Sequence, residues 1–220
     1  LFFGAGSVLH ATGTREMSRL GGLWRAMPWT AGLFGLGAVA ICGLPPLNGF
    51  VSEWLVYLGL FDATISHGSA AWAAIPAAIL LAVTGALALA CFVKVCSVVF
   101  LGAPRSVAAQ RAHESGPAMR GAMLTLAGAC GAIGLVPVFF WPAIARAAQA
   151  WRPAWEGAAA PAPLFTLGAV NLGLAALAAT AAWWLWRRVR RNGLARALTW
   201  DCGYAAPTAR MQYTAGSFAA

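Results

Sequence analysis

The acid best placed to do chemistry in this sequence is Glu53, which lies well inside a long apolar run. It follows the interrupted stretch 43–49, with its two adjacent prolines, by about one helical turn. A carboxylate in hydrocarbon costs several kcal/mol, so such residues are rare and usually functional. Broken helices draw water or ions, and Asn48 and Ser52 can hold water beside Glu53. A carboxylate there is able to accept and release a proton; the alternative is an inert, solvated Glu53 near the outer interface.

Two further residues extend the hypothesis of a proton path. Lys94 precedes the end of an apolar run at Leu101 by seven residues. A buried cation there either shifts the pKa of a neighbouring group or relays a proton; the alternative is a lysine that snorkels to the lipid headgroups. His10 ends the first apolar run, and imidazole titrates in the range that suits proton entry, whereas the alternative is an ordinary polar cap. We therefore predict Glu53, Lys94 and His10 as residues of the proton path.

Composition indicates the environment of these residues. The chain has 220 residues, of which 60% are hydrophobic and 10% are charged, whereas a soluble domain carries roughly 25% charged residues. A soluble core of this size could not bury so much apolar surface, but lipid can. We predict an all-α fold, a polytopic transmembrane helix bundle with one proline-broken helix, over residues 1–186. A basic cytoplasmic tail follows over residues 187–220.

Four complete spans are predicted where apolar runs can cross a hydrocarbon core of about 30 Å. They lie near residues 29–61, 71–101, 119–141 and 164–186. The first run is too long for one straight span, and its two prolines remove two backbone donors, so the helix should break there. The opening run is too short to span, and we expect it to be the second half of a truncated helix.

Charge indicates how the spans are oriented. The net charge is +9, and the arginines concentrate in segments 11–28 and 102–120 and in the tail. These segments alternate with cation-poor ones, a pattern typical of membrane topology and not of nucleic-acid binding. The positive-inside rule places all three in the cytoplasm, so the first helix runs from outside to inside. Segment 142–163 is then an external loop, with an amphipathic stretch on the membrane surface.

The five cysteines do not indicate a redox centre. None forms a CxxC pair or lies beside a histidine at ligand spacing. Four of them lie inside apolar runs, where a thiol behaves as a small hydrophobe. The sequence therefore predicts no cofactor, no metal site and no disulfide framework.

Six phrases of the sequence carry a resemblance: residues 6–10, 20–23, 27–28 and 43–53, and in the tail 200–204 and 210–214. The first four resemble a known family, the proton-conducting antiporter-like subunits of respiratory complex I and the Mrp antiporters. The two tail phrases are similar to the branch formed by the large membrane subunits of hydrogenase-4 and formate hydrogenlyase complexes (component B). The resemblance covers nearly all of the chain, and the proline-break motif with its acid is specific to the superfamily.

The resemblance implies that Glu53 occupies the place of the Lys or Glu that this family carries in its broken helix on the proton path. It implies a C-terminal-half fragment, from the end of the eleventh helix through the fifteenth, whose Lys–Glu pair lies upstream of residue 1. It further implies a proton-translocating subunit in the bacterial inner membrane that binds no redox cofactor and is not itself the redox catalyst. Its partners would be other membrane subunits and a peripheral redox arm. Two alternatives remain: a self-contained Mrp-type cation/proton antiporter subunit, and a membrane anchor or scaffold without its own proton path.

Overall fold

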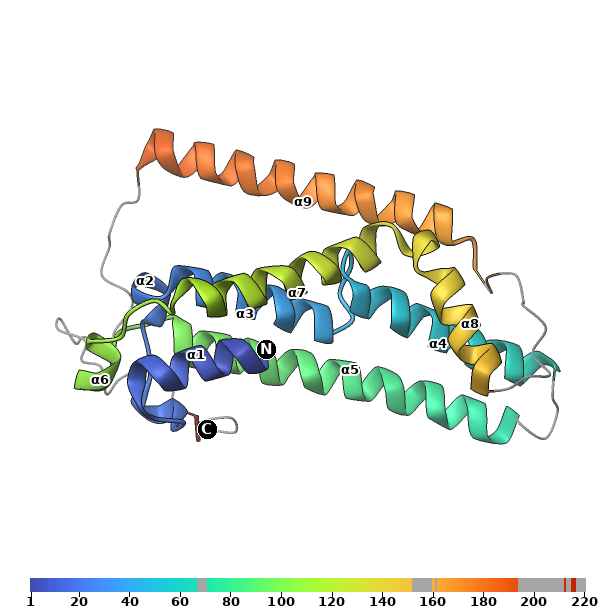
Figure 1. The fold of residues 1–220 in the computed structure, drawn as a ribbon, viewed down its shortest axis with the longest axis horizontal. Coiled ribbons are helices and arrows are strands. Elements are labelled where there is room, and N and C mark those ends of the chain that lie inside the picture. The colour runs from blue at the N-terminus through green and yellow to red at the C-terminus, as the bar shows by residue number, and fades with distance from the viewer. Residues whose placement is uncertain (67–70, 152–159, 161, 194–211, 213–214, 217–220) are drawn as a thin grey trace. The chain divides into compact units, whose positions relative to one another are not determined.

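The computed structural model describes residues 1–66, 71–151, 160, 162–193, 212 and 215–216, and every regular element in these ranges is a helix (Figure 1). The prediction of an all-α fold is confirmed. The elements in chain order are α1 (Phe2–Thr12), η1 (Met17–Arg19), α2 (Leu23–Ala26), α3 (Pro28–Ile41), α4 (Asn48–Ser66), α5 (Ala71–Phe100), α6 (Val107–Gln110), α7 (Pro117–Leu135), η2 (Pro137–Phe139), α8 (Trp141–Trp151) and α9 (Leu164–Asn192).

Three helices among the described residues are long and apolar enough to cross a membrane: Trp72–Phe100 in α5, Pro117–Leu135 in α7 and Leu164–Asn192 in α9. The shortest has 19 residues, or about 28 Å at 1.5 Å per residue, close to the hydrocarbon thickness. The remaining predicted span is divided into α3, with 14 residues, and α4, with 19. α3 is a shorter apolar helix, and α4 carries Glu53 and Asp62 among its apolar residues.

The interruption between α3 and α4 confirms the predicted proline-broken helix. Gly43, with φ of 64°, adopts the left-handed conformation that ends helices without a Cβ penalty. Its N–H bonds to the Ala40 carbonyl at 3.2 Å, and the next residue's N–H bonds to the Val39 carbonyl at 3.3 Å. This is the Schellman arrangement, which satisfies the last carbonyls of α3. Pro45 and Pro46, joined by a cis peptide bond, follow at once.

Two helix ends differ from the boundaries of the apolar runs. The run 119–141 ends as an α-helix at Leu135, and Pro137, which has no N–H to extend it, opens η2. α9 continues beyond residue 186 to Asn192. Its arginines lie over tryptophans one turn earlier: Arg187 is 4.2 Å from the ring centroid of Trp183. The tail phrases 200–204, 210–211 and 213–214 lie outside the described residues.

α8 is an amphipathic helix within the segment predicted to contain one. One face carries Trp141, Ile144, Ala148 and Trp151, which recur at helical spacing. Arg146 lies on the opposite face. Such a helix can lie in the plane of a membrane interface with its apolar face in the acyl boundary. The rest of the predicted loop, at residues 152–159 and 161, lies outside the described residues.

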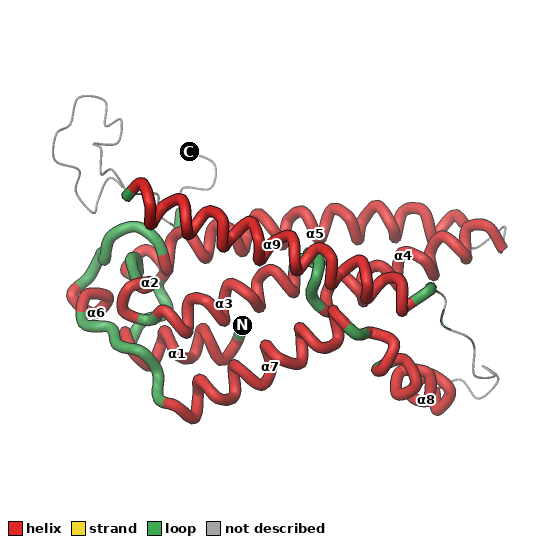
Figure 2. The backbone as a smooth tube through the Cα atoms, turned by 90° about the horizontal axis from the view of Figure 1, so that it is seen from above, coloured by secondary structure: helices red, strands yellow, loops and turns green. Residues whose placement is uncertain are grey.

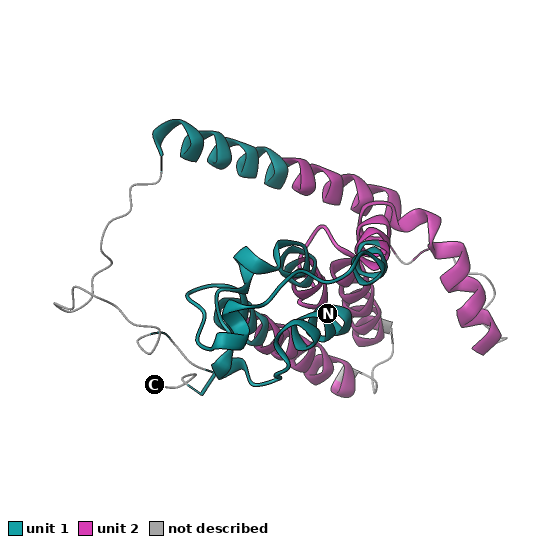
Figure 3. Cartoon of the chain, turned by 60° about the vertical axis from the view of Figure 1, so that its left-hand side comes forward, with its two compact units in different colours: residues 1–35, 91–124, 177–220 teal, residues 36–90, 125–176 magenta. Residues whose placement is uncertain are grey.

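The chain divides into two compact units, coloured separately in Figure 3. Unit 1 comprises residues 1–35, 91–124 and 177–220, and unit 2 comprises residues 36–90 and 125–176. Unit 1 has a buried core in which the Phe34 ring packs against Phe100, with centroids 5.3 Å apart, and against Phe92. Gly4 of α1 lies directly on that ring, because a Cβ there would be 2.9 Å from a Phe34 ring carbon.

The loops of unit 1, green around α2 and α6 in Figure 2, bring the basic segments together. The Gly22 N–H bonds to the Leu101 carbonyl at 2.8 Å. Gly21 packs so closely on the same loop that a Cβ would lie 2.6 Å from the Ala103 carbonyl oxygen. Gln212 of the tail accepts a 2.9 Å hydrogen bond from the Ala103 N–H. Segments 11–28 and 102–120 therefore lie together, with one described tail residue on them.

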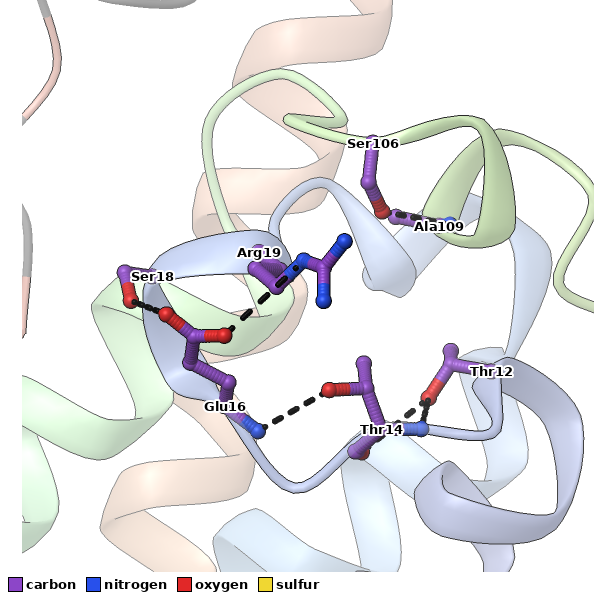
Figure 4. A network of polar contacts seen from close by, with 7 residues as sticks. All are labelled: Thr12, Thr14, Glu16, Ser18, Arg19, Ser106 and Ala109. Atoms are coloured by element: carbon purple, nitrogen blue, oxygen red, sulfur yellow. Dashed lines mark hydrogen bonds and ion pairs between the residues drawn. The ribbon is translucent and has the colours of Figure 1, made fainter.

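The loop after α1 is held by its own side chains (Figure 4). Thr12 donates to the Val8 carbonyl at 2.7 Å, and the Thr14 hydroxyl accepts from the Glu16 N–H at 3.2 Å. Glu16 also faces Arg19 at 3.8 Å. These bonds fix the exit of α1, where His10 lies in the last turn.

Candidate functional site

Glu53 lies in the second turn of α4, and its carboxylate turns back toward the break. A Cβ added to Gly43 would overlap Oε2 of Glu53, so any side chain at that point of the break would displace the carboxylate. On the facing helix α5, a Cβ on Gly85 would lie 3.4 Å from Oε1 of Glu53. Gly43 therefore leaves room for the carboxylate at the end of α3, and Gly85 places the middle of α5 within contact distance of it.

A cavity of about 410 Å³ opens beside this carboxylate within unit 2. Glu53 is its charged member, and the other lining side chains are aromatic, aliphatic or small. The aromatic ones come from α4 and the small ones mainly from α5. The lining residues are Cys42, Gly43, Phe50, Glu53, Trp54, Tyr57, Ala82, Gly85, Ala86 and Leu89. The half-buried carboxylate thus borders an open hollow whose other lining side chains are mainly apolar.

The two polar neighbours predicted to hold water beside Glu53 differ from each other. Ser52 is exposed and donates to the Gly49 carbonyl at 2.9 Å, so its hydroxyl serves its own helix. Asn48 begins α4, and its buried Oδ1 accepts no hydrogen bond from the described residues. Asn48 therefore keeps an acceptor for water at the break, whereas the Ser52 hydroxyl proton is used within its own helix.

The end of α7 packs against the other side of the break. A Cβ on Gly134 would overlap the Pro46 carbonyl oxygen and lie 2.7 Å from Leu47 Cα. The Gly134 carbonyl accepts a 2.7 Å hydrogen bond from Nδ2 of Asn171 on α9, a side chain that is fully buried. Sequence reasoning did not select Asn171, although an amide inside the apolar run 164–186 is the kind of signal that found Glu53.

The other two predicted residues lie elsewhere in the chain. Lys94 is half-buried on α5 in the part of that helix assigned to unit 1. His10 is exposed in the last turn of α1, also in unit 1. Glu53 belongs to unit 2. The structure thus places Glu53 at a cavity beside a helix break, His10 at a helix end and Lys94, half-buried, on a long apolar helix.

A second acid, Glu114, forms a polar cluster that sequence reasoning missed. Its carboxylate accepts hydrogen bonds from the Thr30 hydroxyl at 2.6 Å and from the Trp29 N–H at 2.8 Å. The Thr30 hydroxyl also lies 3.0 Å from that of Ser7, and both residues are fully buried. Partial burial raises the pKa of Glu114, but hydrogen bonds from Thr30, Ser115 and Trp29 favour the charged form more strongly and lower its pKa below 4.5.

These features define a class: a polytopic α-helical membrane protein in which a carboxylate lies at a broken helix beside a cavity. Residues 1–79, which include the break and Glu53, match the family described as NADH:quinone oxidoreductase/Mrp antiporter, TM. Hydrogenase-4 component B of Escherichia coli (strain K12) is 39% identical over 216 residues, which cover 93% of this chain and 32% of that protein. Formate hydrogenlyase subunit 3 of the same organism is 39% identical over 148 residues, covering 67% of this chain and 24% of that protein.

A solved structure gives the same assignment. The Mrp complex from Dietzia sp. DQ12-45-1b aligns with a TM-score of 0.53 and 28% sequence identity, over 90% of this chain and 24% of the matched chain. The chain therefore belongs to the family of antiporter-like membrane subunits. It spans about a third or less of the length of these relatives.

Proposed function

We propose that this chain is part of a proton-translocating membrane subunit of a redox-driven complex, of the hydrogenase-4/formate hydrogenlyase or NADH–quinone oxidoreductase type, with Glu53 on the proton path. The observation that carries the proposal is the position of Glu53, half-buried at a cavity beside a broken helix. Charged side chains at membrane depth that line a cavity mark ion pathways. The likeness to hydrogenase-4 component B supports the redox-driven type.

Lys94 and His10 are proposed as further members of the path. A half-buried cation on α5 suits a residue that shifts the proton affinity of its surroundings as a proton passes. An exposed imidazole at the end of α1 suits proton entry from water. The contact of segments 11–28 and 102–120 supports a common side for them, and their arginines favour the cytoplasmic side of a bacterial inner membrane.

The proposal is tested by proton translocation in sealed vesicles that contain the intact complex. Glu53→Gln keeps the size and hydrogen-bonding capacity of the side chain but cannot transfer a proton, so it should abolish or strongly reduce translocation. Glu16→Gln is the matched control, because that acid is exposed in a loop and should not matter. Translocation at the native rate by Glu53→Gln, with normal subunit content, would show that Glu53 is not on the path.

The likeness to the Mrp complex favours a second candidate, a cation/proton antiporter subunit that works without a redox partner. The two candidate functions differ in the energy source that drives proton movement. A redox-driven subunit acidifies vesicles only when an electron donor is supplied, whereas an antiporter exchanges Na⁺ or K⁺ for protons when a cation gradient is imposed. A membrane anchor would do neither. The proposed partners, other membrane subunits and a peripheral redox arm, belong to the first candidate.

A further inference from the structure

Asn171 has a fully buried polar side chain and is not among the residues proposed for the proton path. Its amide orientation is determined by its partner, since only an N–H can donate to the Gly134 carbonyl at 2.7 Å. That orientation leaves Oδ1 without a hydrogen bond from any described residue. Capping the carbonyl end of α7 therefore explains the Nδ2 group of Asn171 but not its Oδ1.

A second buried amide oxygen without a hydrogen bond belongs to a residue that directly follows the contacts of Gly134. Gly134 is packed against Pro46 and Leu47, and the next residue is Asn48, whose Oδ1 also lacks a partner among the described residues. Both unsatisfied atoms are acceptors, on segments that meet at the last turn of α7. Pro45 and Pro46 have no N–H groups, so the break itself offers few donors.

The ligand that fits is a small molecule that donates at least two hydrogen bonds. Water meets this requirement, and buried waters in proteins commonly bridge polar groups that lack other partners. We propose that Asn171 and Asn48 hold an ordered water at the helix break and that this water is part of the proton path, which makes α9 a contributor to that path. The second half of the statement rests on the proposed function, whereas the water site does not.

The site lies within reach of Glu53. The carboxylate packs against Gly43, and the Asn171 partner Gly134 packs against Pro46 and Leu47. Gly43 and Leu47, against which the two groups pack, are at most about 14 Å apart, because four residue steps span no more than that. A short chain of waters covers such a distance. Asn171 is then a positioning residue, which orients water and does not itself exchange the proton.

The test combines a high-resolution experimental structure of the intact complex with vesicle assays. We expect water density about 2.8 Å from Asn171 Oδ1 and within hydrogen-bond distance of Asn48 Oδ1. Asn171→Leu, which has a similar volume and no polar atom, should lose that density and reduce translocation by about tenfold or more, because proton transfer through one water depends on its position. Asn171→Asp, protonated, keeps a donor and an acceptor and should retain most activity. Val170→Ala, on the exposed face of α9, is the control and should behave as the native protein.

Several results would overturn the inference. A dry site, a protein donor on Asn171 Oδ1, or a cation coordinated there would refute the water site. Loss of the water in Asn171→Leu with native translocation would refute its role in the path. If Asn171→Leu does not assemble, the native density and the Asn171→Asp rate decide. A native rate in Glu53→Gln together with the expected water density would refute the proposed function and leave the water site standing.

Discussion

Removing the Glu114 carboxylate should loosen the start of α3, and the structure gives the size of the effect. Pro28 has no N–H, and the Ala31 N–H bonds to the Met27 carbonyl at 2.9 Å. The two other N–H groups of this first turn, on Trp29 and Thr30, are directed at Glu114. A residue 84 positions away therefore supplies the cap that a local side chain usually provides.

The expected loss follows from the bonds involved. Glu114 accepts two short bonds, at 2.6 and 2.8 Å, and weaker ones at 3.1 and 3.4 Å. A hydrogen bond to a charged group contributes about 1.5–3 kcal/mol, and partial exposure of the carboxylate places the total toward the low end, at about 2–3 kcal/mol for Glu114→Ala. For a chain of this length that is a fall in Tm of about 4–12 °C. Glu114→Gln, which keeps one acceptor oxygen but loses the charge, should fall by roughly half as much.

The assay is thermal unfolding in nanodiscs at several pH values. Because the pKa of Glu114 is lowered in the folded state, its stabilisation is present above the ordinary value of 4.5 and is lost as the pH falls through the folded-state pKa. The difference in Tm between the native chain and Glu114→Gln should therefore shrink below about pH 4.5. Glu16→Ala is the control, since its exposed 3.8 Å ion pair with Arg19 contributes under about 1 kcal/mol. Equal Tm values for Glu114→Ala and Glu16→Ala would refute the reasoning.

Three other outcomes are expected. Gly134→Ala should destabilise the fold by about 1–3 kcal/mol, because its Cβ would overlap Pro46. Gly128→Ala, in open space on the same helix, should be neutral or stabilising by up to about 1 kcal/mol. Similar unfolding curves for the two variants would contradict this. A cysteine at the exposed Val107 should resist membrane-impermeant thiol reagents in intact cells and react after the cells are opened. Labelling of this cysteine in intact cells would show that the topology is the opposite of the predicted one. Lys94→Met should impair proton translocation with assembly intact, and a native rate would favour a lysine that only snorkels.

Features that depend on neighbouring residues were predictable from the sequence. The long apolar runs become α5, α7 and α9, because a chain in lipid must satisfy its backbone hydrogen bonds within the helix. The break falls at residues 42–47, because two prolines remove donors and Gly43 adopts a left-handed conformation at no Cβ cost. Glu53 lies beside that break for the same local reason. The sequence also contained the amide of Asn171, but not the reason to select it.

The tertiary structure alone decided which distant groups meet. Thr30 and Glu114 are 84 residues apart, and Asn171 and Gly134 are 37 residues apart. Spacing along a helix says which side chains share a face, but not which face of another helix lies opposite. Gly134 illustrates the difference: in an Ala- and Gly-rich chain it is one small residue among many, and only the approach of Pro46 shows that a side chain does not fit there. The acceptors left at the break depend on that packing, because a buried amide oxygen lacks a donor only when the surrounding helices supply none.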